Sequence, residues 1–186
     1  MKRAAILISV LVAFTLPLQA QFCNPPYQCQ AGGTCSSFYQ LLGDYNFESN
    51  CGFWGYSGTA GLTTAPVCTW PNNHVGYVSA FMYSHGGTIA QTFSTFADGT
   101  NNFSLTFTYE STNMQTGDYV DVWIIHNGQW VYLDTLTGNV WCTTKSYSFG
   151  STGWAGQLMQ VRFEGHINAA PATMYFDEVG LWQQRN

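Results

Sequence analysis

The sequence contains little charge and very few basic residues. Asp, Glu, Lys and Arg make up only 8% of the 186 residues, and Lys and Arg together number five. A nucleic-acid-binding surface needs a basic stripe, so this composition argues against a nucleic-acid partner. Disordered chains combine high charge with few aromatic residues, whereas 17% of this sequence is Phe, Trp or Tyr. The composition therefore predicts a folded domain.

Long hydrophobic runs are also missing after the first 20 residues. Lys2 and Arg3 precede an apolar run, and Ala20 supplies a small residue for cleavage. This pattern is typical of a secretory signal peptide over residues 1–20. No later segment contains the roughly 20 apolar residues of a transmembrane helix. We therefore expect a secreted protein, extracellular or at the cell surface, that does not insert into a membrane after cleavage.

Cysteine is present in an even number, and every copy follows the predicted cleavage site: Cys23, Cys29, Cys35, Cys51, Cys68 and Cys142. In an exported chain this number predicts disulfides. The spacings do not fit paired zinc knuckles. The sequence does not choose among the possible pairings, but we favour a local pair between Cys51 and Cys68, with Cys142 tied to one of the first three. Residues 21–44, rich in Cys, Pro and Gly, are expected to be an extension to a domain over residues 45–186.

No segment has a convincing helical period. Short alternating runs recur instead between Gly, Asn, Asp and Ser, at residues 77–83, 88–93, 102–110, 118–126, 129–136, 145–150, 158–166 and 173–181. This spacing predicts an all-β sandwich or barrel. Asn127-Gly128 and Asp98-Gly99 predict hairpin turns between consecutive strands.

The alternation also predicts which side chains face the core. The core set is Phe103, Leu105, Phe107, Tyr109, Val120, Val122, Ile124, Met159, Val161 and Phe163. Other residues of the same strands combine aromatic rings with polar groups on the opposite side. Sugars bind to aromatic faces with a few polar anchors for their hydroxyls. We therefore predict a carbohydrate-binding platform made of Tyr119, Asp121, Trp123, Gln160 and Arg162. The alternative binding aromatics are Trp54, Trp70 and Trp154.

Motifs at the two ends of the predicted domain resemble a known superfamily. Asn46-Phe47-Glu48 with Cys51 and Trp54 (NFESNCGFW), and VRFEG followed by MYFDEVGL, resemble MAM adhesion domains. They are equally similar to the galactose-binding-like jelly rolls that serve as bacterial carbohydrate-binding modules. The middle segment DYVDVWIIHNGQWVYLDTLTG resembles accessory jelly rolls of secreted bacterial proteases. The resemblance covers residues 45–182 and implies a jelly-roll β-sandwich of two antiparallel sheets.

The same resemblance implies a structural calcium site. In such jelly rolls the first and last strands are neighbours and each supplies a carboxylate, which here matches Glu48 and Asp177. Calcium prefers carboxylate and carbonyl oxygens, so these residue types suit it. Asp44 and Glu178 are additional nearby oxygen donors. The alternative is that Glu48 and Asp177 accept backbone hydrogen bonds near the sheet edge.

Catalytic motifs are scarce. The sequence has no G-x-S-x-G elbow, no H-E-x-x-H and no phosphate-binding loop, and its four His residues are dispersed. Retaining glycoside hydrolysis needs two carboxylates about 5 Å apart, and Glu110 and Glu164 are the one candidate pair. The three-acid E-x-D-x-x-E signature of jelly-roll glucanases is absent, and the Glu of VRFEG has no chemical role in MAM-like domains. We therefore expect that the protein is not an enzyme.

Three functions follow from these observations. The leading hypothesis is a secreted, non-catalytic carbohydrate-binding or adhesion module whose partner is a polysaccharide or glycan. The second is a subunit of an extracellular filament or matrix, because few Lys and Arg residues protect the strand edges against self-association and residues 21–44 could clasp a neighbouring subunit. The third is a glycoside hydrolase that uses Glu110 and Glu164.

Overall fold

The computed structural model describes residues 38–48, 51–64, 68, 79–168 and 171–185. The predicted signal peptide, Cys23, Cys29, Cys35 and Trp70 lie outside these residues. The described part contains no helix, and so none that could cross a membrane. Its strands are β1 (Phe38–Gln40), β2 (Gly55–Thr63), β3 (Ser79–Ser94), β4 (Gly99–Thr112), β5 (Tyr119–His126), β6 (Gln129–Thr137), β7 (Val140–Gly150), β8 (Leu158–His166) and β9 (Thr173–Arg185).

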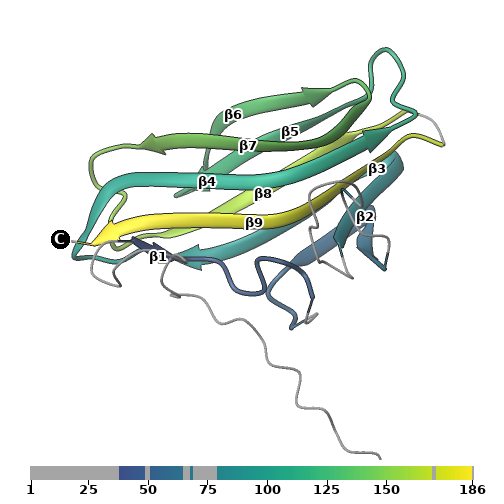
Figure 1. Cartoon of the computed structure of the whole chain (residues 1–186). Helices are drawn as coiled ribbons and strands as arrows, with labels where there is room; N and C mark the ends of the chain where they lie inside the picture. Colours follow the sequence, from purple (N-terminus) through teal and green to yellow (C-terminus); the bar gives the residue numbers. More distant parts are fainter. Residues whose placement is uncertain (1–37, 49–50, 65–67, 69–78, 169–170, 186) are drawn as a thin grey trace, which may run out of the picture.

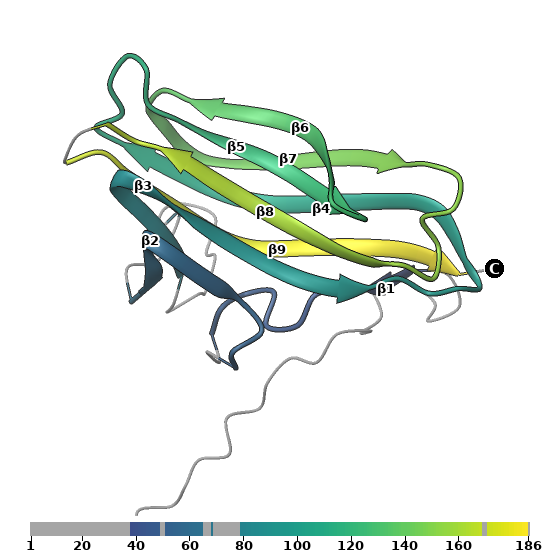
Figure 2. The same ribbon diagram turned by 180° about the vertical axis from the view of Figure 1, so that it is seen from behind.

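The strands form two antiparallel layers, which confirms the predicted jelly-roll sandwich. Strands β1, β9, β4 and β7 form one layer, here called sheet I, which faces the viewer in Figure 1. Strands β6, β5, β8, β3 and β2 form the other, sheet II, which faces the viewer in Figure 2. The interior between the layers is therefore lined by one face of each sheet.

Strand β3 belongs to both layers. Residues 80–83 pair with β9, and residues 88–94 pair with β8. The strand bends between these two parts, where His85 and Gly86 have φ angles of 71° and 69°. A Cβ atom on Gly86 would lie only 2.1 Å from the carbonyl oxygen of Gly165, so only glycine fits. The Gly-rich break between the two predicted strands is thus a bend within one strand that changes sheets.

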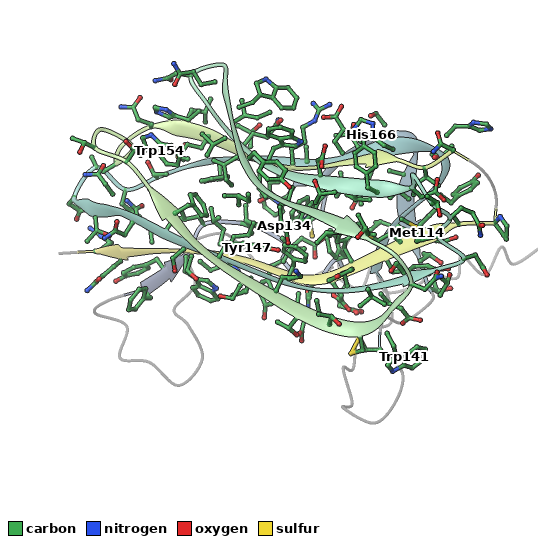
Figure 3. All side chains as sticks on the ribbon, turned by 90° about the horizontal axis from the view of Figure 1, so that it is seen from above. Met114, Asp134, Trp141, Tyr147, Trp154 and His166 are labelled. Carbon is green, nitrogen blue, oxygen red and sulfur yellow. A yellow bond between two sulfur atoms is a disulfide. The ribbon has the colours of Figure 1, made fainter. Side chains whose placement is uncertain are left out.

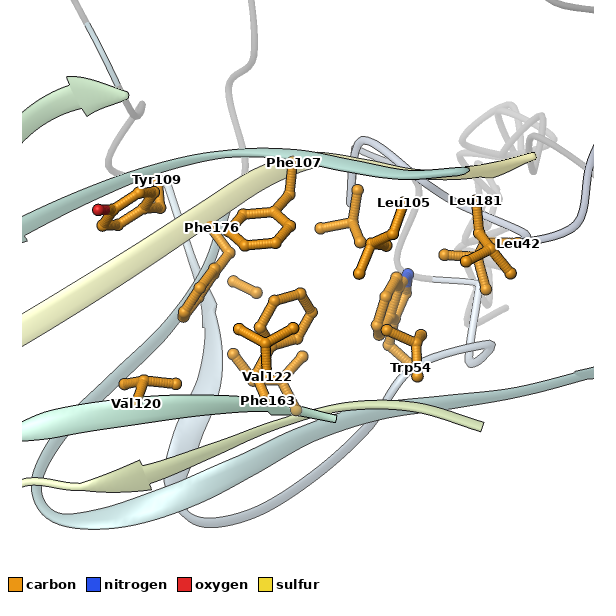
Figure 4. Close-up of a cluster of buried hydrophobic side chains, with 14 of the residues drawn as sticks. Leu42, Trp54, Leu105, Phe107, Tyr109, Val120, Val122, Phe163, Phe176 and Leu181 are labelled. Atoms are coloured by element: carbon orange, nitrogen blue, oxygen red, sulfur yellow. The ribbon is translucent and has the colours of Figure 1, made fainter. Parts of the chain in front are cut away.

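The core lies between the sheets and contains every residue that the alternation assigned to it. Those residues are at most 4% exposed. Figure 4 shows Phe107 and Phe176 of sheet I facing Val122 and Phe163 of sheet II. The rings of Phe107 and Phe163 meet edge to face, with centroids 5.0 Å apart. Burial of these aromatic side chains is the main contribution that holds the two layers together.

Two local predictions need correction and one is confirmed. Strand β2 was missed, because GYSGTAGLT has little alternation and three glycines. The Asp98-Gly99 turn joins β3 to β4, which are not neighbours since β9 lies between them, so it is not a hairpin. Asn127-Gly128 does form the β5–β6 hairpin, with φ angles of 49° and 75° that match its preferred turn type.

The predicted disulfide pairing is wrong. Cys68 is bonded to Cys142, with Cα atoms 4.9 Å apart, and Figure 3 shows this bond beside Trp141. Cys51 also forms a disulfide, but not with Cys68. The reason is that Cys68 lies against the outer face of sheet I, where its backbone N–H donates to Glu110 Oε2 at 3.2 Å. Sequence spacing could not reveal that contact.

The edge strands β6 and β7 are joined by a polar cluster. Asp134 Oδ2 accepts hydrogen bonds from the Tyr147 hydroxyl at 2.5 Å and from Lys145 Nζ at 3.1 Å, and Figure 3 shows Asp134 beside Tyr147. Burial raises the pKa of the Asp134 carboxyl, but these hydrogen bonds outweigh burial and hold its pKa below the ordinary value. The cluster therefore ties sheet II to sheet I at this edge.

Candidate functional site

The outer face of sheet II carries all five residues of the predicted platform. We call this surface the open face and define it by Tyr119, Asp121, Trp123, Ile125, Trp130, Tyr132, Thr135, Gln160, Arg162, Glu164 and His166. Cross-strand pairing arranges these side chains in rows. Trp123 lies between Tyr132 and Arg162, and Ile125 lies between Trp130 and Gln160. The alternation of residues in the sequence therefore assigned these five side chains to one face of the sheet, and the structure agrees.

Two aromatic residues of the open face were missed by the sequence analysis. Trp130 and Tyr132 are 47% and 53% exposed, more than any residue of the predicted platform. Their rings lie edge to face with Trp123, at centroid distances of 5.6 and 5.4 Å. The sequence could have predicted them: the Asn127-Gly128 turn places β6 beside β5, and the alternation in QWVYLDTL puts Trp130 and Tyr132 on the same side of β6.

A bulge in β6 separates Tyr132 from Asp134. Val122 pairs with Asp134 whereas the next residue, Trp123, pairs with Tyr132. Strict alternation would place Tyr132 and Asp134 on one face. The bulge instead turns Asp134 toward β7 and leaves Tyr132 and Thr135 on the open face. One extra residue thereby separates a structural carboxylate from the aromatic cluster.

The polar groups of the open face are ordered around Asp121. The Tyr132 hydroxyl donates to Thr135 Oγ1 at 2.8 Å, and Thr135 Oγ1 donates to Asp121 Oδ1 at 2.5 Å. His166 Nε2 lies 3.8 Å from Asp121 Oδ2, and its ring stacks on Tyr119 with centroids 4.5 Å apart. These contacts fix a carboxylate among aromatic rings, which suits it to accept hydrogen bonds from a ligand.

A pocket of about 730 Å³ opens beside Asp121. Its floor comes from the open face and its wall from the loop before β5; the lining includes Met114, Gln115, Thr116, Gly117, Asp118, Tyr119, Asp121, Trp123, Tyr132 and Thr135. Two smaller hollows, of about 460 and 280 Å³, lie on the same side of sheet II, and both reach Gln160. The volume of the pocket beside Asp121 falls within the range of about 300–1,000 Å³ that is typical of small-ligand sites.

The wall of this pocket is held by Asp118. Its side chain is buried, and its carboxylate accepts backbone hydrogen bonds from Asn168 at 2.8 Å and Gln115 at 2.9 Å. These two hydrogen bonds lower the pKa of the Asp118 carboxyl. Asn139 Oδ1 also accepts from the Met114 N–H at 2.8 Å. The loop is therefore fixed by its own Asp118 and by contacts with two other parts of the chain, at Asn139 and Asn168.

Two of the three alternative binding tryptophans are not on the surface, and the third, Trp70, lies outside the described residues. Trp54 and Trp154 are only 6% and 8% exposed and belong to the core. Trp154 packs against Phe103 and Phe149, and the Trp54 Nε1–H donates to the Asp44 carbonyl at 3.0 Å. Loop position suggested exposure, but both residues pack inward, which does not favour them as a binding platform.

Glu110 and Glu164 do not form a pair. Glu110 lies on β4 and faces outward from sheet I, where it binds the Cys68 N–H. Glu164 lies on β8 and belongs to the open face of sheet II, where it forms an ion pair with Arg162 at 3.3 Å. The core separates the two carboxylates, so the predicted catalytic pair is wrong. The expectation that the protein is not an enzyme stays a prediction.

The residues of the predicted calcium site lie on neighbouring segments. The Val179 N–H donates to the Tyr45 carbonyl at 2.8 Å, so the segment that carries Glu48 runs beside the part of β9 that carries Asp177. Asp177 is buried, and its Oδ1 accepts from the Glu178 N–H at 2.7 Å. Among the described residues no group of three or more His, Cys, Asp or Glu side chains could hold a metal ion. Calcium binding at this place stays a prediction.

No family model and no curated protein matches the sequence. Solved structures do match. A family 61 carbohydrate-binding module in complex with β-1,4-galactotriose has 14% identity and a TM-score of 0.58, and the match covers 76% of this chain and 97% of that one. The chain has the jelly-roll fold of such modules. An apo cyclase from Fischerella sp. matches with 13% identity and a TM-score of 0.60, covering 82% of this chain and 98% of the cyclase.

A third match is the N-terminal part of a Clostridium thermocellum xylanase, which contains a family 22 carbohydrate-binding module and a family 10 catalytic module complexed with xylohexaose. It has 14% identity and a TM-score of 0.54, and the match covers 80% of this chain and 28% of that one. At such identities the likeness shows the fold alone. The same fold occurs in binding modules and in a cyclase, so the function must be argued from the site.

Proposed function

We propose that the protein is a secreted, non-catalytic module that binds neutral glycans through its open face. The observation that carries this proposal is the pair of rings Trp123 and Tyr132, which lie edge to face and line the pocket of about 730 Å³. The Tyr132 ring is about half exposed. Large aromatic surfaces with a few fixed polar groups are what a sugar-binding site needs.

The polar residues around the cluster match sugar hydroxyls in type. Asp121 accepts hydrogen bonds, and Gln160 and Arg162 donate them. The Gln160 side chain already contacts Thr92 Oγ1 at 3.2 Å, which shows that it lies flat on the sheet rather than pointing into solvent. A pyranose ring placed on Trp123 and Tyr132 would therefore meet both acceptors and donors.

The charges of the open face favour a neutral glycan over an acidic one. Asp121 and Glu164 are negatively charged. The arginine of this face, Arg162, forms an ion pair with Glu164. A uronate carboxylate placed beside Asp121 would meet a like charge with no unpaired cation of the open face to offset it. The net charge of −5 for the chain adds a weaker repulsion of the same sign.

Glycan binding can be tested with paired tryptophan variants. A glycan array followed by calorimetric titration should show binding to neutral oligosaccharides and no binding to uronate polymers. Trp123→Ala should weaken binding at least tenfold, which is about 1.4 kcal/mol. Trp141→Ala is the matched control, because Trp141 is 59% exposed on β7, away from the open face. Equal losses in both variants, or no binding to any glycan, would contradict the proposal.

A further inference from the structure

Two N–H groups at the centre of the open face are buried without a hydrogen-bond partner among the described residues. They are Nε1 of Trp123 and Nε of Arg162. The two residues are directly paired across β5 and β8, so the unsatisfied groups belong to one location. Buried polar groups in native proteins are nearly always hydrogen-bonded. Two adjacent exceptions on a candidate binding face therefore point to a partner that comes from outside the protein.

One exposed side chain contacts both of these residues. The Trp130 ring lies 5.6 Å from the Trp123 ring, and Arg162 Cζ lies 4.9 Å from the Trp130 centroid. Trp130 is on β6, which is the last strand of sheet II. Its indole therefore extends from the sheet edge toward the middle of the open face, where it packs against both residues that carry the two donors.

Trp130 is held less firmly than its neighbour Tyr132. The Tyr132 hydroxyl is anchored to Thr135, which is anchored in turn to Asp121. Trp130 makes ring contacts but no side-chain hydrogen bond to any other described residue. A rotation of the Trp130 side chain breaks only these ring contacts, whereas Tyr132 would also have to break a hydrogen bond.

We propose that Trp130 is a movable cover over two donors reserved for the ligand. In this proposal, which rests on the proposed function, a neutral glycan displaces the Trp130 ring. Trp123 Nε1–H and Arg162 Nε–H then donate to sugar hydroxyl oxygens. The glycan forms these two hydrogen bonds only with the open conformation, and this difference in affinity shifts the population toward the open form.

The motion of the cover is tested first without any ligand, by hydrogen exchange of indole N–H groups followed by NMR. Trp54 is the internal reference, because its buried Nε1–H is hydrogen-bonded to the Asp44 carbonyl. We expect the Trp123 N–H to exchange at least tenfold faster than that of Trp54, and Trp130→Ala to accelerate it further. Exchange of Trp123 as slow as that of Trp54 would overturn the cover, whatever the protein binds.

The role of the donors is tested by titration with neutral oligosaccharides, with galactotriose and xylohexaose as probes. Trp123→Phe keeps a ring and removes the N–H, and Arg162→Lys keeps the charge and removes Nε. Each should weaken binding about tenfold, whereas Trp130→Ala should bind at least as tightly as the wild type and associate faster. Weakening by Trp130→Ala of more than threefold, or wild-type affinity in Trp123→Phe, would overturn the inference. Fast exchange together with no binding to any probe would instead refute the proposed function.

Discussion

The outer faces of the two sheets are built on the same alternation but carry different residues. On sheet I the outward positions of β4 and β7 pair small hydroxyl residues with one another, as in Ser104 with Ser148 and Thr106 with Ser146. Thr108 and Thr144 on this face share a hydrogen bond at 3.0 Å. On sheet II the equivalent rows contain Trp, Tyr, Asp, Glu and Arg. Alternation decides which residues face outward, and the kind of residue distinguishes the hydroxyl-rich face of sheet I from the face of sheet II that we propose binds a glycan.

The two faces also use their carboxylates differently. Glu110 on sheet I binds the backbone of Cys68, next to the disulfide that ties Cys68 to Cys142. On the open face Asp121 has a hydroxyl and an imidazole as neighbours and lines a pocket. A carboxylate that satisfies the protein's own backbone contributes to stability, whereas one that lines a pocket can also serve a ligand.

The largest effect on stability should come from a substitution in the core, which lies between the two sheets. Phe107→Ala should lower the free energy of unfolding by about 3–5 kcal/mol, because it removes the ring that packs against Phe163. Urea denaturation measures this change. Leu158→Ala, at a position 63% exposed, is the control and should change stability by less than about 0.5 kcal/mol. Similar effects of the two substitutions would contradict the described core.

The disulfide should matter for sheet I and not for the open face. Cys142→Ala breaks its bond to Cys68 and should cost about 2–4 kcal/mol of stability. Below the melting temperature this variant should keep the glycan affinity of the wild type, as measured by calorimetry. Loss of binding in a folded Cys142→Ala variant would mean that the two faces are coupled.

The fixed loop should support the pocket of the open face. Asp118→Ala removes the acceptor of two backbone hydrogen bonds and should destabilise the protein by about 1–3 kcal/mol. We also expect severalfold weaker glycan binding, because the pocket wall loosens. Asp98→Ala removes an exposed ion pair with Arg185 and should change neither quantity measurably. Unchanged glycan affinity in Asp118→Ala would show that this wall of the pocket does not contribute to glycan binding.

The smallest expected effect on stability concerns Asp134, at the edge where β6 and β7 join the two sheets, and it should appear only at acidic pH. The pKa of Asp134 is lowered in the folded protein, so its ionised form stabilises the fold at pH values above its ordinary pKa of about 3.9. This contribution should disappear as the pH falls below about 4, through the lowered folded-state pKa. Between pH 5 and pH 2, Asp134→Asn should lose about 1 kcal/mol less stability than the wild type, as measured by thermal unfolding. The same loss of stability in both proteins would show that the Asp134 cluster does not stabilise the edge between β6 and β7.

The strand pattern could be read from the sequence where alternation was regular. Phe107, Val122 and Phe163 were assigned to the core correctly, and Trp123 and Arg162 to one outer face, because a side chain's face follows from its position in a strand. Strand β2 lacked this signal, since glycines occupy many of its positions. Its existence depends on pairing with β3, which is a tertiary contact.

Other features depended on contacts that no local pattern records. The Cys68–Cys142 bond and the separation of Glu110 from Glu164 follow from which strand lies in which sheet. Trp130 was missed for a different reason, because the face of its strand was readable but was not assigned. The unsatisfied N–H groups beneath it emerge only from packing in three dimensions.

The most direct test of the central claim is to map glycan contacts on the two faces by NMR. The ¹H–¹⁵N spectrum of the wild-type protein is followed during titration with a neutral oligosaccharide that the array identifies. We predict that the largest shifts occur at the open face, at the Trp123 indole and the Gln160 amide, while Thr106 and Thr144 stay unchanged. Shifts centred on Thr106 and Thr144, with the open face unaffected, would contradict the account.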